Sequence, residues 1–169
     1  PGSESTFIET TLNSVVAPCN NSPIFSNKPV PYICANQPYQ YSNGAIDPDG
    51  DSLAYEIVNP KSGNNQGITQ PIPFVNPFNL TYPLATSPVN DFNFDPNSGQ
   101  MSFTPDGLQQ PVLSVRVKEY RNGILIGSIV RDIQMIVLNC NNQVPLLSPA
   151  TNVSGGILTG QTFSVCAGA

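Results

Sequence analysis

The sequence predicts an all-β protein built as an antiparallel β-sandwich, and three observations carry this prediction. Apolar and polar residues alternate in several short segments, which is the pattern of half-buried strands. The chain holds 13 Gly and 18 Pro among 169 residues, and Pro interrupts almost every window long enough for a helix. No stretch shows a convincing amphipathic period of 3.6 residues. Short strands joined by turns satisfy all three observations.

The expected strands follow one another at short intervals. Alternation predicts strands from Tyr39 to Ser42 and from Leu53 to Val58. Two further short strands, Phe92 to Phe94 and Met101 to Phe103, bracket a turn at Asp95 to Gly99. The segment from Lys61 to Pro88 is rich in Asn, Gln and Pro, and we expect a long loop or an irregular edge there.

The strongest local prediction is a β-hairpin. Its first strand runs from Val112 to Tyr120, Asn122 and Gly123 supply the positive φ angles of a tight turn, and the chain returns from Ile124 to Leu138. Alternation places one set of apolar residues on a common buried face: Val115, Val117, Ile133, Met135 and Val137.

Two adjacent charged residues in the returning strand have two interpretations. Arg131 and Asp132 would form a recognition pair in one, and each would have its own structural partner in the other. Neighbouring residues of a strand point to opposite faces, which favours the structural interpretation.

Composition excludes several classes of function. Only 10% of residues are charged, the formal net charge is -5, and the six Lys and Arg are scattered from Lys28 to Arg131. Binding to nucleic acid or to an anionic membrane requires a basic patch, so we expect neither partner. No apolar run approaches the roughly 20 residues that span a bilayer, so we expect no membrane insertion.

A partial internal repeat defines the expected domains. Cys19-Asn20-Asn21 recurs as Cys140-Asn141-Asn142, and each copy is followed by a Pro-rich stretch and by a second cysteine, Cys34 or Cys166. Such self-similarity is typical of tandem arrays. We therefore expect a tag remnant and the lead-in from a preceding module at residues 1–18, one full module at 19–139, and the junction and start of the next module at 140–169.

The four cysteines predict disulfides and an extracellular location. The chain has no His, so the commonest zinc spacings are missing, and disulfides persist outside the cytosol. Four cysteines allow three pairings. Treating both copies of the repeat alike predicts Cys19 with Cys34 and Cys140 with Cys166, and the alternative joins Cys19 to Cys140 across the module.

The run from Asp47 to Asp51 is the main candidate site. It places Asp47, Asp49 and Asp51 at alternate positions, with Gly50 permitting a tight turn. Closely packed carboxylates repel one another unless a cation neutralises them, and Ca²⁺ prefers oxygen ligands. Position twelve is Val58 and not Glu, so the run is not an EF-hand. The alternative is an acidic turn that stays solvated.

The order of motifs resembles cadherin-like and PKD-type repeats. These motifs are the acidic run with its following strand, the segment Phe94 to Met101, a strand that ends at Glu119, and the second Cys-Asn-Asn. More narrowly, the segments Glu119 to Gly123, Ile126 to Ser128 and Arg131 to Gln134 resemble modules of the giant gliding adhesins of Bacteroidota, which the type 9 secretion system exports.

The resemblance implies an Ig-like or cadherin-like sandwich, a set of calcium ligands and a location. Asp47, Asp49 and Glu119 match the positions that bind calcium near the junction with the preceding module, and Asn20 and Asn21 match linker residues that lend oxygens. The linker lacks the carboxylates usual in cadherins, so we expect one ion per module. The implied partners are neighbouring modules of the same chain, at the surface of the outer membrane, with the fragment itself monomeric.

The sequence favours a binding or spacer role over catalysis. The usual general base is missing without His, and no nucleophile elbow is present. The module would serve as a rigid spacer or an adhesive segment in surface attachment and gliding. The alternative is a polysaccharide-binding module whose ligand surface uses the aromatic residues Phe74, Phe78 and Tyr82.

Overall fold

The structure, a computed structural model, confirms the predicted fold class. It describes residues 8–63, 69–140, 156–159 and 162–165, and every regular element in these ranges is a β-strand. The chain divides into two compact units, Pro1–Asn139 and Cys140–Ala169. The second unit contains an antiparallel pair, β14 (Gly156–Thr159) and β15 (Thr162–Val165).

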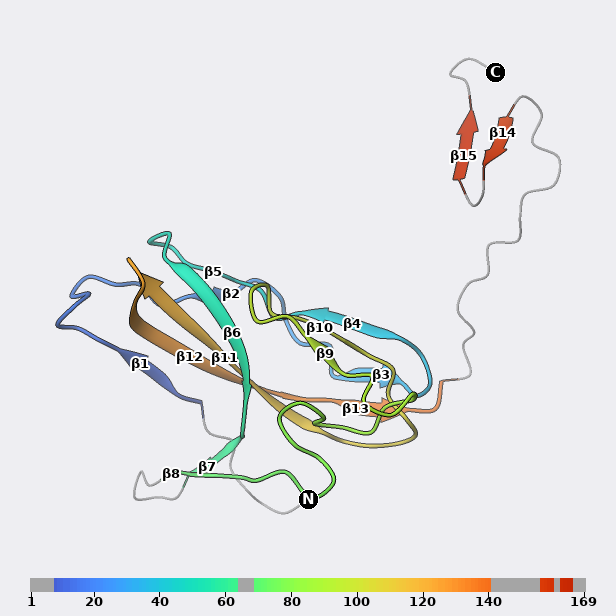
Figure 1. Cartoon of the computed structure of the whole chain (residues 1–169), viewed down its shortest axis with the longest axis horizontal. Helices are drawn as coiled ribbons and strands as arrows, with labels where there is room; N and C mark the ends of the chain where they lie inside the picture. The colour runs from blue at the N-terminus through green and yellow to red at the C-terminus, as the bar shows by residue number, and fades with distance from the viewer. Residues whose placement is uncertain (1–7, 64–68, 141–155, 160–161, 166–169) are drawn as a thin grey trace. The chain divides into compact units, whose positions relative to one another are not determined.

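The described residues of the first unit form thirteen strands, most of them short (Figure 1). In chain order they are β1 (Thr10–Leu12), β2 (Ile24–Phe25), β3 (Tyr32–Cys34), β4 (Tyr39–Ser42), β5 (Ala45–Ile46), β6 (Ser52–Val58), β7 (Lys61–Gly63), β8 (Thr69–Pro71), β9 (Asn93–Phe94), β10 (Gln100–Phe103), β11 (Val112–Arg121), β12 (Ile124–Gln134) and β13 (Ile136–Leu138).

One layer is the antiparallel sheet β1-β12-β11-β6 (Figure 1). Its centre is the predicted hairpin of β11 and β12, whose turn residues Asn122 and Gly123 have φ angles of 52° and 78°. Both values are positive, as the tight turn requires. The returning strand was expected to continue to Leu138, but it breaks at Met135. The backbone N–H of Met135 donates to Pro111, and the chain then changes its pairing partner.

The other strands pair in smaller sheets around the same core. The antiparallel sheet β4-β10-β9 contains the predicted strands on either side of the Asp95 to Gly99 turn. Strand β13 pairs with β3 in parallel, with Leu138 opposite Cys34, and β2 pairs with β5. This arrangement is consistent with a sandwich of two layers.

The buried core takes side chains from both layers. The face predicted for the hairpin is confirmed, since Val115, Val117, Ile133, Met135 and Val137 are all buried. The core also receives Ile33, Tyr41, Ile57, Met101 and Phe103 from other strands, and Leu84 from the segment between β8 and β9. Removing these apolar surfaces from water is the main stabilising contribution to the sandwich.

Arg131 and Asp132 point to opposite faces, as the structural interpretation predicted. The Arg131 guanidinium lies 3.8 Å from the ring centre of Phe25 and donates to the Oδ1 of Asn43 at 2.9 Å. Asp132 instead accepts a hydrogen bond from the Ser114 hydroxyl. Burial raises the pKa of the Asp132 carboxyl and lowers the pKa of Arg131.

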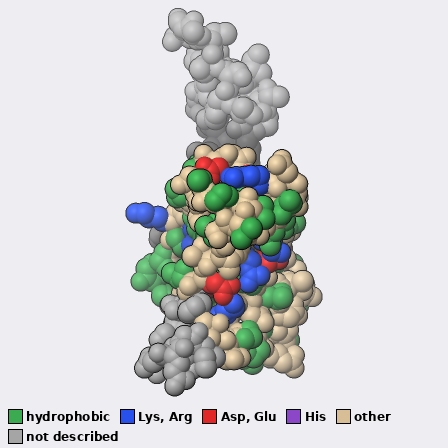
Figure 2. Space-filling model, turned by 90° about the vertical axis from the view of Figure 1, so that its left-hand side faces the viewer, with side chains coloured by type: hydrophobic (Ala, Val, Ile, Leu, Met, Phe, Trp, Pro, Cys, Tyr) green, Lys and Arg blue, Asp and Glu red, His purple; other side chains and the backbone are tan. Residues whose placement is uncertain are grey.

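Most of the basic residues in the described ranges have acidic partners. Arg116 and Lys118 both contact Glu56, at 2.9 and 2.7 Å, and Lys61 pairs with Glu9. On the face shown in Figure 2, acidic and basic side chains lie beside one another without a broad patch of either sign.

Both predicted disulfide pairings are wrong. Cys34 and Cys140 form a disulfide, and Cys19 is a free, exposed thiol. The parallel pairing explains the bridge, because Leu138 lies opposite Cys34 and Cys140 follows two residues later. Cys19 precedes Asn20, which contacts Glu119 close to the turn of the β11–β12 hairpin, whereas Cys34 pairs near the far end of that hairpin. Cys166 lies outside the described residues.

Candidate metal centre

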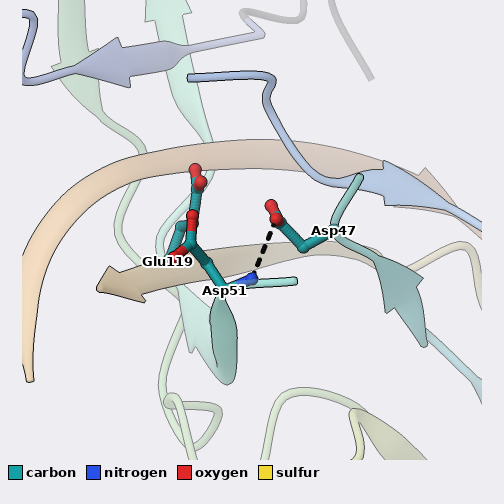
Figure 3. A group of neighbouring side chains, drawn as sticks. All are labelled: Asp47, Asp51 and Glu119. Atoms are coloured by element: carbon teal, nitrogen blue, oxygen red, sulfur yellow. Dashed lines mark hydrogen bonds between the residues drawn. The ribbon is translucent and has the colours of Figure 1, made fainter. Parts of the chain in front are cut away.

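Three carboxylates from two distant segments converge beside the hairpin (Figure 3). Asp47 and Asp51 flank the turn between β5 and β6, and Glu119 lies near the end of β11. One oxygen of each residue lies within 4.8 Å of the other two. Calcium binds oxygens at about 2.3–2.6 Å, so two oxygens on one ion are up to about 5 Å apart. The spacing therefore fits a single shared cation.

The turn itself is built around the Asp47 side chain. Its Oδ1 accepts hydrogen bonds from the backbone N–H groups of Asp49, at 2.9 Å, and Asp51, at 3.0 Å. Gly50 has a φ of 81°, a conformation that a residue with a Cβ adopts only with strain. The other oxygen, Oδ2, is buried and has no hydrogen-bond partner among the described residues. A buried acceptor without a partner is costly, and a cation would satisfy it.

Glu119 is the most buried acid of the group, with 1% of its surface exposed. Burial raises the pKa of its carboxyl, the hydrogen bond from Asn20 opposes this rise, and the charge of Asp47 adds to it. Ionisation of Glu119 is therefore less favourable in the folded protein than for a solvated glutamate. A divalent ion beside the carboxylate would offset this effect.

Gly127 provides the space for the Glu119 carboxylate. The two residues lie opposite each other in the hairpin, because a β-bulge between Glu119 and Tyr120 shifts the register by one residue. A Cβ on Gly127 would lie 2.7 Å from Oε2 of Glu119 and 3.3 Å from the Thr11 carbonyl oxygen. No side chain larger than hydrogen fits there without displacing the carboxylate.

We therefore expect Gly127→Ala to weaken calcium binding at least tenfold, because the added methyl group pushes the Glu119 carboxylate out of the group. Calorimetric titration with calcium measures the change. The control is Gly107→Ala, whose added Cβ meets no atom within 4 Å; its φ of 66° strains the alanine, so this variant should lose stability but keep its calcium affinity. Equal calcium affinity in the Gly127 variant and the unchanged protein would contradict the role assigned to this glycine.

Arg121 is the residue that sequence reasoning missed. Its Nη2 lies 2.5 Å from Oδ2 of Asp51, its Nε donates to the same carboxylate at 2.9 Å, and its Nη2 lies 3.6 Å from Asp49. These hydrogen bonds hold the pKa of Asp51 below its ordinary value. One guanidinium against three acids leaves the group with an excess of negative charge, so Arg121 neutralises it only in part.

Asn20 and Asn21 also reach the acidic residues, as hydrogen-bond donors. Asn20 Nδ2 donates to Oε1 of Glu119 at 2.5 Å, and its own Oδ1 accepts from Arg121 at 2.8 Å. Asn21 donates to Asp49 from its backbone N–H at 2.7 Å and from Nδ2 at 2.9 Å.

Asp49 lies outside the group of three carboxylates. Its hydrogen bonds with the Asn21 backbone and side chain lower the pKa of its carboxyl. The ligand roles expected for Asp49, Asn20 and Asn21 stay predictions.

The aromatic residues expected to form a ligand surface are all partly buried. Phe74 and Phe78 line a groove of about 380 Å³ together with Ile72, Leu84 and several prolines. Tyr82 packs on Phe78, with ring centres 5.5 Å apart. The lining is mainly apolar, and the Gln109 side chain in it already bonds to the backbone of Ala85. The polysaccharide alternative stays a prediction.

Comparisons with known proteins do not identify a family for this chain, so its function is argued from the fold and the site. No protein-family profile matches the chain, and neither does any curated protein or solved structure. The described part of the chain contains no helix with the length and hydropathy of a membrane span.

Proposed function

We propose that the chain is a non-catalytic, calcium-binding β-sandwich module of a long extracellular adhesin. The observation that carries the calcium proposal is the group of Asp47, Asp51 and Glu119, with their oxygens within 4.8 Å and one buried oxygen of Asp47 left without a partner. All three supply carboxylate oxygen, which is the ligand chemistry that calcium prefers.

Calcium at this position would neutralise the negative charge of the three carboxylates. Three carboxylates and the Arg121 guanidinium sum to a formal charge of about −2, which a divalent cation balances. Asp47 and Asp51 would hold the ion from the turn before β6, and Glu119 would hold it from β11. The ion would thereby stiffen the end of the sandwich against which Asn20 and Asn21 pack.

The adhesin part of the proposal is supported by the internal repeat and by the resemblance to gliding-adhesin modules. A repeated module joined through Cys-Asn-Asn segments is suited to act as a rigid spacer that holds other parts of a surface protein away from the cell. Its partners would be the neighbouring modules of the same chain.

The direct test is a calorimetric calcium titration of the whole chain with two variants. Glu119→Gln keeps the shape of the side chain but removes its charge, so we expect it to abolish binding. Asp95→Asn changes an acid in a different turn, one that bonds to Asn97 and Ser98, and should bind calcium like the unchanged protein.

Proton competition gives a second readout. Because the pKa of Glu119 is raised, protons should compete with calcium and weaken its binding at a higher pH than for an ordinary glutamate. Absence of binding by the unchanged chain at millimolar calcium would overturn the proposal.

A further inference from the structure

Arg121 is the only basic side chain in the described ranges that forms an ion pair with the acids around the candidate metal centre. The other basic residues that form ion pairs contact Glu9 or Glu56 instead. A guanidinium keeps its proton in proteins, so the charge of Arg121 is permanent. The acidic group therefore has a positive charge of its own beside it, whether or not an ion is bound.

The register of the strands places Arg121 beside these acids. Tyr120 lies opposite Ser52, so the next position along the two antiparallel strands brings Arg121 opposite Asp51. Arg121 also follows Glu119 by two residues in β11, and the extra residue of the β-bulge belongs to β12, so β11 keeps its alternation. Alternation puts the two side chains on the same face of the sheet.

The Arg121 guanidinium contacts both oxygens of the Asp51 carboxylate. Nε lies 2.9 Å from Oδ1 and 3.2 Å from Oδ2, and Nη2 lies 2.5 Å from Oδ2. The Asp51 side chain is only 7% exposed, so little water reaches this pair. A calcium ion shared by the three carboxylates would bind an oxygen that already faces a positive charge. Because two cations on one carboxylate repel each other, Arg121 and the ion oppose each other's binding.

Arg121 also holds the Asn20 amide in an orientation that opposes an ion. Its Nη2 donates to Oδ1 of Asn20 at 2.8 Å, and Asn20 Nδ2 donates to Oε1 of Glu119 at 2.5 Å. The N–H group on that oxygen stands where calcium would need an acceptor. Without Arg121, the amide would be free to turn its oxygen toward the ion, which is the role expected for Asn20 from the sequence.

We infer that Arg121 is a tethered competitor of calcium, which stabilises the acidic group without the ion and lowers its affinity for the ion. Its charge reduces the repulsion among the carboxylates in the calcium-free protein. The same charge opposes a bound cation, so the site fills only where calcium is abundant. The inference rests on the proposed function, because it assigns a regulating residue to the same calcium site.

The test compares Arg121→Met with Arg116→Met, which removes the same charge from the same strand. Methionine is unbranched and supplies no oxygen to calcium. We expect calorimetric titration with calcium chloride to show about tenfold tighter binding by Arg121→Met than by the unchanged chain, because a positive charge beside the ion is lost. Arg116 pairs with Glu56, which keeps Lys118 as a partner, so Arg116→Met should bind within about twofold of the unchanged chain.

Melting in chelator gives a second readout with the opposite sign. Arg121→Met leaves the acids without a counter-charge, so it should melt about 5 °C below the unchanged protein in chelator and gain more than that protein from calcium. A purely structural role for Arg121 would lower stability without tightening calcium binding. If the variant is unfolded in chelator, calcium should restore its fold, which circular dichroism detects.

The outcomes separate this inference from the proposed function. Calcium binding by the unchanged chain, with equal or weaker binding by Arg121→Met, would overturn the inference and leave the proposed function intact. Binding by Arg121→Met alone would support the inference and overturn the proposed function, because the guanidinium would then take the place of the ion. Absence of binding in all three proteins would overturn both.

Discussion

Calcium at 10 mM is expected to raise the melting temperature of this protein by about 5–10 °C over its value in chelator. A ligand at a hundred times its Kd that binds only the folded state adds about 2.7 kcal/mol to the free energy of unfolding. Extracellular calcium sites often have a Kd of about 10⁻⁴–10⁻³ M, and 10 mM calcium is a hundred times the lower of these values. For a chain of this size, each kcal/mol corresponds to about 2–4 °C. Differential scanning calorimetry measures the shift.

Asp47→Asn and Asp49→Asn form the matched pair for this experiment. Both replace one carboxylate of the same turn by an amide of equal size, but only Asp47 belongs to the group of three. We expect Asp47→Asn to lose most of the calcium shift, and an equal loss in Asp49→Asn would assign Asp49 the ligand role predicted from the sequence. Identical melting of the unchanged protein in calcium and in chelator would show that the turn is merely solvated.

Loss of the Cys34–Cys140 bridge is expected to lower the free energy of unfolding by about 4–5 kcal/mol. The bond closes a loop of roughly 100 residues, and a loop of that length is worth about this much in the chain-entropy description. The double variant Cys34→Ser, Cys140→Ser avoids leaving a single reactive thiol. Its melting temperature should fall by about 10–20 °C.

Cys19→Ser is the control for the disulfide variant. Cys19 is exposed and unpaired, so its replacement should change the free energy of unfolding by no more than about 0.5 kcal/mol. Unreduced protein should also take up an alkylating reagent at Cys19 and not at Cys34 or Cys140. A large stability loss in the Cys19 variant, with none in the double variant, would contradict the observed pairing.

The hairpin shows how much of the fold could be predicted from the sequence. Alternating apolar residues and the Asn122-Gly123 turn are local signals, and they predicted the hairpin of β11 and β12 but not the break at Met135. Counting outward from that turn without a bulge would place Ile126 opposite Glu119. The bulge places Gly127 there instead. Nothing in the local pattern indicates the bulge, so the space made for the carboxylate could not be predicted.

Part of the candidate site could be predicted from the sequence, and the rest depends on the order of strands in the sheet. The spacing of Asp47 and Asp51 is a local signal, and the resemblance supplied Glu119. Arg121 was missed because its contact with Asp51 joins β11 to the start of β6, which depends on the sheet order. The predicted disulfide pairing was wrong for a similar reason. Similarity between the copies of a repeat suggested bonds within each copy, whereas the parallel pairing of β3 with β13 joins the two ends of one module.

The Cys34–Cys140 bond has a mechanical consequence for a chain that is pulled from both ends. Tension entering at one of these cysteines passes to the other through the covalent bond, so residues 35–139 carry none of the load. Fully extended, these residues would add about 350–380 Å of length. With the bond intact, a surface protein built from such modules would lengthen only through segments outside the closed loop, which include β1 and β2. Reduction would release the additional length of residues 35–139.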